Sequence, residues 1–226
     1  MKISEAALQR RTFFHRIQFD DGSYTDGISD PRYTLDTLQF PADASGMELA
    51  DIGCADWGLS IEMLRRGAKA ISALDIFDYP GHHVLRREHP ELVPADRFTF
   101  RQGSVEDESL FRESWNVDAV VFSGVLYHLV SPYLAILNIA RIMTPGTKLY
   151  LETHGMNDAP DAPPRMEFIQ PLLLNGDPTN IWSPSESCVI AMLQQAGFMD
   201  VSCIDRRPMR YADRIEHMRF FFHATR

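Results

Sequence analysis

The feature that most limits the fold is an alternation of short apolar runs with segments of helical period, which continues from Glu48 toward the C-terminus. Alternation of this kind is typical of a mostly parallel sheet flanked by helices. It predicts an α/β fold with seven strands, at residues 47–52, 69–75, 96–103, 117–124, 147–155, 199–206 and 218–226. Helices are expected between them, at about residues 59–66, 79–90, 106–113, 132–143 and 187–196, the last one behind a capping box at 183–186.

The length of the chain favours one main domain. With 226 residues, of which 45% are hydrophobic, it can bury one full-sized core. We expect that domain to span residues 47–226. Residues 1–46 are polar and rich in turn signals, and we expect them to form an N-terminal cap segment. Residues 157–180 contain five prolines, and a loop of this length in a compact domain is usually a lid or a binding segment.

Charge and cysteine content bound the partners and the compartment. The chain has 22 Lys and Arg against 31 Asp and Glu, and the resulting formal charge of -9 argues against a nucleic-acid partner. Its three cysteines lie in or beside apolar runs, which fits reduced, buried thiols. The N-terminus lacks the apolar core of a signal peptide, and no run has the ~20 apolar residues of a membrane span. We therefore expect a cytoplasmic location, and the oligomeric state stays open.

A glycine turn follows the first strand, in the stretch ELADIGCADWGLS. Gly53, Ala55 and Gly58 form a loose match to the fingerprint of dinucleotide-binding turns. Asp75, at the end of the second strand, is placed to bind the two hydroxyls of a ribose. Two ligands fit this arrangement, a dinucleotide and S-adenosylmethionine.

The charge of the turn separates these two ligands. Asp51 and Asp56 flank it, and no Lys or Arg lies in it. A dinucleotide would place its pyrophosphate there, and at an effective dielectric near 20 one misplaced unit charge at ~4 Å costs about 4 kcal/mol. Two acids therefore favour the positively charged sulfonium of S-adenosylmethionine. In the alternative interpretation, Asp56 only caps the next helix and Asp51 only ends a strand.

Three further positions are expected to bind the same cofactor. Ser104 and Val105 follow the third strand, where a hydroxyl and a backbone amide can contact an adenine edge. Gly124 ends the fourth strand, and ligands of open α/β sheets bind at this edge. Each of these positions is also compatible with an ordinary turn.

Residues for catalysis and acceptor binding are expected at the ends of the fourth and fifth strands. His128 is the candidate general base, because an imidazole titrates near neutral pH, and its neighbour Tyr127 is expected to line the methyl-transfer site. The candidates for acceptor binding are Glu152, His154 and Trp182. For each of them a purely structural role stays open.

A metal site is not expected. His82, His83 and His89 lie close in sequence, but adjacent residues on a helix point about 100° apart and do not chelate one ion easily.

The stretches DIGCADWGLSIEMLRRGAKAISALD and FSGVLYHLVSPYLAILNIARIMTPGTKLYLET resemble the class I S-adenosylmethionine-dependent methyltransferases. More narrowly, they resemble the branch that contains the tRNA wobble-uridine carboxymethyltransferases, over roughly residues 17–198, with GVLYH-x-x-SP as the most specific element. The resemblance implies a Rossmann-like, seven-stranded methyltransferase sheet with helices on both faces. It also implies a cofactor site at Asp51, Gly53, Ala55 and Asp75. The chain departs from the pattern at Ala55, where a glycine is usual, and at the bulky Trp57.

Taken together, these observations predict an enzyme that transfers a methyl group from S-adenosylmethionine to a small-molecule acceptor, in the setting of specialised metabolism. Three alternatives stay open: a tRNA-modifying methyltransferase or carboxymethyltransferase, the latter with a carboxylated cofactor; an NAD-dependent oxidoreductase; and a non-catalytic module that binds the cofactor. The sequence does not indicate which atom of the acceptor is methylated.

Overall fold

The structure is a computed structural model that describes residues 12–159, 162–169, 177–211 and 214–226. The chain divides into two compact units, Met1–Ser104 and Val105–Arg226. The expected cap lies within the first unit and the expected lid within the second. Parts of both, residues 1–11, 160–161 and 170–176, lie outside the described part of the chain.

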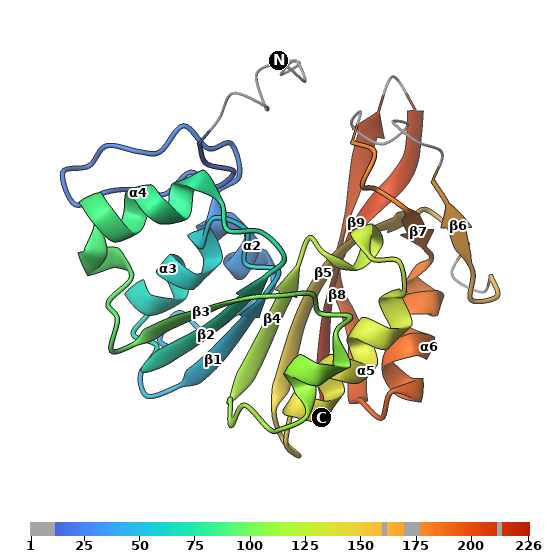
Figure 1. The fold of residues 1–226 in the computed structure, drawn as a ribbon. Helices are drawn as coiled ribbons and strands as arrows, with labels where there is room; N and C mark the ends of the chain where they lie inside the picture. The colour runs from blue at the N-terminus through green and yellow to red at the C-terminus, as the bar shows by residue number, and fades with distance from the viewer. Residues whose placement is uncertain (1–11, 160–161, 170–176, 212–213) are drawn as a thin grey trace. The chain divides into compact units, whose positions relative to one another are not determined.

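The first unit contains three parallel strands in the order β3-β2-β1. They are β1 (Glu48–Ile52), β2 (Ala70–Asp75) and β3 (Phe98–Gln102). Two helices, α3 (Gly58–Arg65) and α4 (Pro80–Glu88), lie on one face of these strands (Figure 1). A short 3-10 helix, η1 (Pro90–Leu92), follows α4. Strand register places Asp75 opposite Gln102, so that the ends of β2 and β3 lie at one edge.

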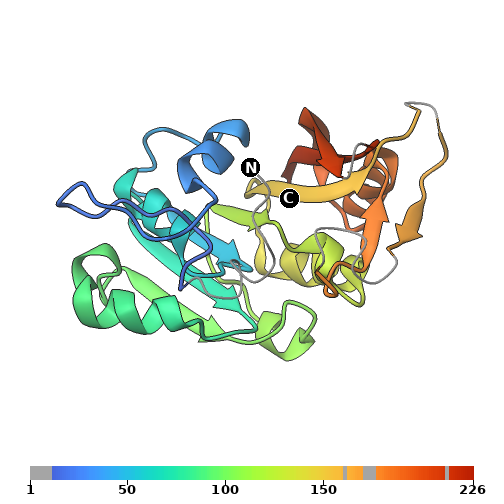
Figure 2. The same ribbon diagram turned by 90° about the horizontal axis from the view of Figure 1, so that it is seen from above.

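Residues 12–46 contribute to the fold of the first unit. They contain α2 (Pro31–Thr37), whose N-cap Asp30 accepts a hydrogen bond from the backbone N–H of Arg32. The loop before α2, dark blue in Figure 2, runs across the first unit. Buried side chains of this segment, among them Ile17, Leu35 and Leu38, join the hydrophobic core.

The second unit contains four strands in the order β4-β5-β9-β8. They are β4 (Ala119–Ser123), β5 (Lys148–Met156), β8 (Met199–Tyr211) and β9 (Arg214–Thr225). β4 and β5 are parallel, whereas β9 runs antiparallel to both β5 and β8. Two longer helices, α5 (Pro132–Ile142) and α6 (Glu186–Gln195), lie along these strands (Figure 1). The 3-10 helix η2 (Glu108–Phe111) precedes β4, and the 3-10 helix η3 (Leu126–His128) lies between β4 and α5.

The insertion after β5 forms a small antiparallel pair, β6 (Met166–Phe168) and β7 (Trp182–Pro184). The predicted capping box at 183–186 is wrong in register. Ser183 lies inside β7, and Ser185 is the N-cap of α6, where its side chain accepts a hydrogen bond from the backbone N–H of Cys188 at 3.2 Å. The cap moves because β7 continues through Pro184 before the helix can start.

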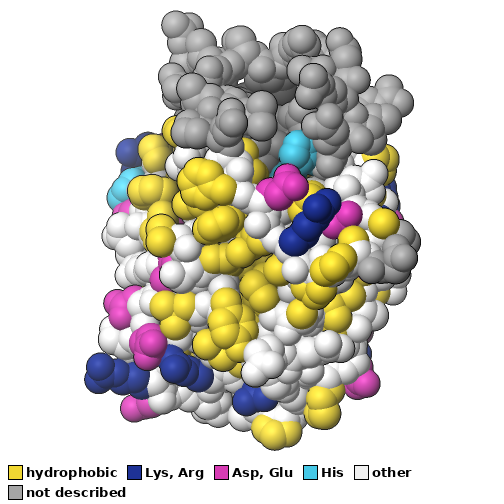
Figure 3. Space-filling view, turned by 90° about the vertical axis from the view of Figure 1, so that its right-hand side faces the viewer, with side chains coloured by type: hydrophobic (Ala, Val, Ile, Leu, Met, Phe, Trp, Pro, Cys, Tyr) yellow, Lys and Arg dark blue, Asp and Glu magenta, His cyan; other side chains and the backbone are white. Residues whose placement is uncertain are grey.

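One side of the second unit is shown in Figure 3, where hydrophobic side chains reach the surface between charged ones. The bidentate ion pair of Arg206 on β8 with Glu186 on α6 links the strand to the helix.

β8 is the outer strand of its sheet, and it carries Pro208 together with register shifts that interrupt its pairing to β9. Such features discourage further strands from adding to an edge.

Together the two units hold the seven strands of the expected fold, and the α/β, Rossmann-like fold class is confirmed. The boundaries of β1 to β5 and of α3 to α6 agree with the alternation in the sequence. The last two strands are longer than expected, and the helix expected at 106–113 is the 3-10 helix η2. Among the described residues, no helix is both long and apolar enough to span a membrane.

Candidate functional site

The glycine turn after β1 is built from alternating left-handed residues. Gly53, Ala55 and Trp57 have φ angles of 77°, 44° and 69°. For a non-glycine residue this conformation is uncommon and needs support from its surroundings. The backbone N–H groups of Gly53 and Cys54 both donate to the carbonyl of Leu74, at 2.7 and 3.1 Å, which ties the turn to β2.

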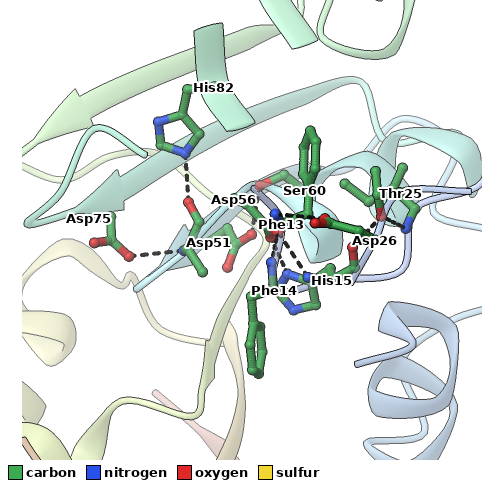
Figure 4. A network of polar contacts seen from close by, with 12 residues as sticks. Phe13, Phe14, His15, Thr25, Asp26, Asp51, Asp56, Ser60, Asp75 and His82 are labelled. Atoms are coloured by element: carbon green, nitrogen blue, oxygen red, sulfur yellow. Dashed lines mark hydrogen bonds and ion pairs between the residues drawn. The ribbon is translucent and has the colours of Figure 1, made fainter. Parts of the chain in front are cut away.

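Asp75 closes the turn from the end of β2. Its Oδ2 accepts a hydrogen bond from the backbone N–H of Ala55 at 2.9 Å (Figure 4). Its Oδ1 accepts one from the backbone N–H of Phe77 at 3.0 Å. The side chain is buried, and burial raises the pKa of its carboxyl group. Each carboxylate oxygen has a second lone pair, so Asp75 can still accept hydrogen bonds from a ligand.

Asp56 points to the N-terminal segment. Its carboxylate accepts hydrogen bonds from the backbone N–H groups of Phe14 at 2.6 Å and His15 at 2.8 Å, and it forms an ion pair with Nδ1 of His15 (Figure 4). Burial would raise the pKa of Asp56, but the charge and the hydrogen bonds of His15 outweigh it and lower the pKa. Asp56 is therefore compensated inside the protein and neither caps α3 nor faces a ligand as an unpaired charge.

Gly58 leaves room for the contact between His15 and Asp56. A Cβ atom at this position would lie 2.3 Å from Cγ of His15, a distance that real side chains do not show. The glycine that the sequence assigns to cofactor binding thus makes room for the histidine that binds Asp56. Its role in cofactor binding stays a prediction.

Asp51 is also buried. Ser60 donates a hydrogen bond from Oγ to its Oδ2 at 2.6 Å, and only 1% of the residue is exposed. Burial raises the pKa of Asp51 to about 6. Of the two acids that flank the turn, Asp51 is the one without an ion-pair partner among the described residues.

Two aromatic residues support the turn, Trp57 within the turn itself and His82 on α4. The indole of Trp57 stacks on the imidazole of His82 with 3.7 Å between ring centroids and 8° between planes. His82 Nε2 donates to the carbonyl of Ala55 at 2.6 Å. His82 is fully buried, and burial lowers its pKa. The sequence suggested only a metal-binding role for His82. Its contacts with Ala55 and Trp57 join residues that are far apart in the chain, so no local sequence pattern indicates them. Among the described residues there is no group of metal-binding side chains.

Ser104 and Val105 stand at the boundary between the two units. Val105 is buried, and its carbonyl accepts a hydrogen bond from the side chain of Asn138 on α5 at 2.9 Å. Gly124, after β4, has a φ angle of 74°, and its N–H donates to the carbonyl of Glu152 at 3.1 Å. The cofactor roles of these three residues stay predictions.

The second unit brings Tyr127 and Glu152 together through Arg219, a β9 residue that the sequence analysis did not single out. The guanidinium of Arg219 donates to Oε1 of Glu152 at 2.6 Å and to the hydroxyl of Tyr127 at 3.2 Å. It also lies 5.1 Å from the ring centroid of Tyr127. Ser123 donates to the other carboxylate oxygen of Glu152 at 3.0 Å. Because Arg219 lies 67 residues after Glu152, only the pairing of β5 with β9 brings them into contact.

His128 has a defined hydrogen-bond partner in the insertion. Its Nδ1 lies 3.1 Å from the carbonyl oxygen of Thr179, to which it can only donate. In the neutral ring this leaves the lone pair on Nε2. Burial lowers the pKa of His128. Tyr127 also contacts the insertion. The N–H of Ile181 donates to the carbonyl of Tyr127 at 2.9 Å, and the side chain of Tyr127 packs against Ile169.

His154 and Trp182 are held by other side chains. His154 is completely buried, its Nε2 lies 3.2 Å from Oγ of Ser183, and burial followed by the charge of His217 lowers its pKa to about 3. Trp182 packs edge-on against Phe168. His154 is therefore neutral at physiological pH, and the acceptor-binding roles of both residues stay predictions.

Comparison with known proteins defines the family. A family model described as "Methyltransferase domain" matches residues 30–203, more than half of the chain. The chain belongs to this family. The predicted methyltransferase family is therefore confirmed, and the NAD-dependent alternative gains no support.

Relatives with different acceptors match the chain at modest identity. The tRNA U34 carboxymethyltransferase of Desulfotalea psychrophila is 29% identical over 168 residues, which are 74% of this chain and 50% of that protein. The ubiquinone biosynthesis O-methyltransferase of Xanthomonas oryzae pv. oryzae is 33% identical over 128 residues, 57% of this chain and 51% of that protein. The chain thus spans about half the length of these relatives.

A solved structure shares the fold over nearly the whole chain. The N-terminal domain of EvdMO1 with SAH bound has a TM-score of 0.64 and 17% identity, and the match covers 99% of this chain and 97% of that one. At this identity the likeness concerns the fold alone. The expectation that nucleic acid is not a partner is not supported, because relatives of this methyltransferase are named as tRNA-modifying enzymes.

We expect the ion pair of Asp56 with His15 to stabilise the fold strongly. Asp56→Ala removes the acceptor of two backbone N–H groups and leaves His15 buried without its partner, which should lower the free energy of unfolding by about 3–5 kcal/mol. Asp21 is an exposed residue of the same segment, and Asp21→Ala is the control, which should leave the free energy of unfolding almost unchanged. Urea unfolding at neutral pH measures both. A loss below 1 kcal/mol in Asp56→Ala would contradict the assignment.

Asp51 makes stability depend on pH in the opposite sense from most carboxylates. Its pKa is raised from 3.8 to about 6, so between these values the folded protein holds a proton that the unfolded chain has released, and stability falls as the pH rises. Asp51→Asn removes this loss. The free energy of unfolding of Asp51→Asn minus that of wild type should therefore rise by about 3 kcal/mol as the pH rises from 3.8 to about 6, and it should stay level at higher pH.

The control for the Asp51 experiment is Asp43→Asn. Asp43 is exposed, and its hydrogen bond with Ser45 lowers its pKa, so its difference from wild type should move in the other direction as the pH rises. Denaturant unfolding at a series of pH values measures both variants. A pH-independent difference for Asp51→Asn would mean that Asp51 is already ionised in the folded protein at low pH.

Proposed function

We propose that the chain transfers a methyl group from S-adenosylmethionine to a small-molecule acceptor. The observation that carries this proposal is Asp75, whose carboxylate is fixed by the N–H groups of Ala55 and Phe77 at the end of β2. A carboxylate held in this way binds the hydroxyls of a ribose without a further loss of side-chain entropy.

The surface beside Asp75 fits an adenosyl group. Ile76 and Phe77 follow it directly and are exposed to 51% and 56%, which is high for large apolar side chains. Exposed apolar side chains next to a fixed polar group are typical of a ligand site. Gly53, left-handed at φ 77°, presents backbone without a side chain at the start of the turn, where a ligand can approach closely.

The charge of the turn also favours S-adenosylmethionine, although one of its three acids is compensated inside the protein. Asp56 is compensated by His15, so the acids that remain are Asp51 and Asp75. Neither has an ion-pair partner among the described residues, and a pyrophosphate beside them would be repelled. A ligand with a sulfonium and an ammonium group is favoured.

We propose His128 as the general base for an acceptor that loses a proton. S-adenosylmethionine supplies the methyl group as an electrophile, so the protein has to align the acceptor, exclude water and take up a proton. The hydrogen bond from Nδ1 to Thr179 orients the ring and leaves Nε2 as the proton acceptor. The lowered pKa keeps this nitrogen unprotonated at neutral pH.

The polar side chains of the second unit support a small, polar acceptor. Tyr127, Glu152 and Arg219 form one hydrogen-bonded group in which the positive and negative charges are balanced. A balanced group of this kind can bind hydroxyl or amine groups, and the formal charge of -9 disfavours a polyanion.

Asp75→Ala should weaken the binding of S-adenosylhomocysteine by roughly 1.5–3 kcal/mol, because charge-assisted hydrogen bonds to the ribose are lost. Isothermal titration calorimetry measures the change. Asp96→Ala, an exposed acid before β3, is the matched control and should leave the affinity unaltered. Equal affinities for wild type and Asp75→Ala would exclude Asp75 from the cofactor site.

His128→Asn should lower kcat by about 10²–10⁴-fold and leave the affinity for S-adenosylhomocysteine unchanged, because asparagine can donate to Thr179 but has no basic nitrogen. Wild-type activity should be lost as the pH falls through a value below the ordinary 6.5 of histidine. Release of S-adenosylhomocysteine, with an acceptor found by screening, measures the rate. His83→Asn, with an exposed side chain, is the control. An unaltered pH profile in His128→Asn would exclude the base.

A second candidate function is carboxymethyl transfer to tRNA. The names of several relatives favour it, and so does Arg219, whose guanidinium next to the Tyr127 hydroxyl could bind a carboxylate on the cofactor. Mass spectrometry of the cofactor that co-purifies with the protein distinguishes the methyl form from the carboxymethyl form. Filter binding of tRNA at low and moderate salt tests the acceptor.

A further inference from the structure

The first unit contains a cavity. None of the candidate site residues discussed above lines it. It has a volume of about 250 Å³ and lies between α4, the segment after it and the edge strand β3. Its walls are hydrocarbon at five positions and cationic at one, and the lining residues are Arg86, Pro90, Val93, Ala95, Phe98 and Phe100. Phe98 and Val93 are buried, so these walls belong to the core of the unit.

Arg86 is held in place by aromatic rings. Its guanidinium carbon lies 4.8 Å from the centroid of Trp57 and 5.7 Å from that of Phe100. Both distances are within the range of cation–π attraction. Trp57 is itself completely buried and stacks on His82, so the surface that supports Arg86 is rigid. The guanidinium is therefore oriented before any ligand binds.

The charge of Arg86 is not neutralised by a close partner. In the described part of the chain, Arg86 has no hydrogen bond and no ion pair. Asp78 is the acid whose charge interacts with it, but the carboxylate of Asp78 bonds to His82 at 2.8 Å and lies 3.5 Å from His83. The neighbouring Arg87, in contrast, forms an ion pair with Glu88.

We propose that this cavity binds a small aromatic carboxylate, with its ring between the apolar walls and its carboxylate on the guanidinium of Arg86. The volume lies just below the usual range for drug-sized ligands and suits a molecule with one ring. A planar guanidinium binds a carboxylate through two parallel hydrogen bonds. A phosphate would carry more charge than one arginine compensates, and a neutral aromatic molecule would leave the positive charge of the guanidinium uncompensated.

Benzoate and benzyl alcohol are matched probes, because they share the ring and differ in charge. We expect benzoate to shift the indole N–H signal of Trp57 in ¹⁵N–¹H NMR spectra in a saturable manner. Benzyl alcohol should bind more weakly than benzoate, by a factor of about ten or more. The signal of Trp57 is assigned by comparison with Trp115→Phe and Trp182→Phe. Saturable shifts confined to Trp115 or Trp182, or equal affinities for the two probes, would overturn the proposal.

Arg86→Gln and Arg87→Gln test the cation. Both residues are exposed on α4, so neither change should disturb the fold, which the unaltered remainder of the spectrum verifies. Arg86→Gln should weaken benzoate binding by about tenfold or more and leave benzyl alcohol unaffected, whereas Arg87→Gln should match wild type. If Arg86→Gln binds benzoate as wild type does, the carboxylate is bound elsewhere and the proposal fails.

Discussion

The contact of His15 with Asp56 is the interaction on which the first unit depends. One carboxylate accepts both backbone N–H groups of Phe14 and His15 and pairs with the imidazole as well, from a position 41 residues further along the chain. Asp56 lies between two left-handed residues, Ala55 and Trp57. The conformation of the turn and the position of the N-terminal segment therefore stabilise each other, and neither is explained by its own sequence.

This contact changes the physical reason for the choice of cofactor. A count of acids around the turn suggests a negatively charged binding surface, but the structure buries these acids at different electrostatic cost. Asp56 is compensated, Asp51 has a raised pKa, and Asp75 is fixed by two backbone N–H groups. Selection between ligands then rests on the individual carboxylates Asp51 and Asp75 and on their hydrogen bonds, and not on a count of acids around the turn.

Local patterns predicted what depends on local periodicity. The strand and helix positions followed from hydrophobic spacing, since a strand such as β4 and a helix such as α5 each bury a repeating set of their own residues. The long-range contacts could not be predicted in this way. Arg219 reaches Glu152 through strand pairing, and the N-cap of α6 moved to Ser185 because β7 extends further than its composition indicates.

The proposed base of the second unit depends on the insertion after β5. The insertion after β5 contacts the end of β4 directly, since Thr179 accepts a hydrogen bond from His128 and Ile181 donates one to Tyr127. The segment that differs most from a minimal α/β fold thus also sets the orientation of the proposed base. A change in this insertion would alter the acceptor surface and the imidazole together, while the turn and Asp75 stay as they are. For this reason the fold does not determine the acceptor, and relatives named for tRNA U34 and for ubiquinone biosynthesis are compatible with one fold.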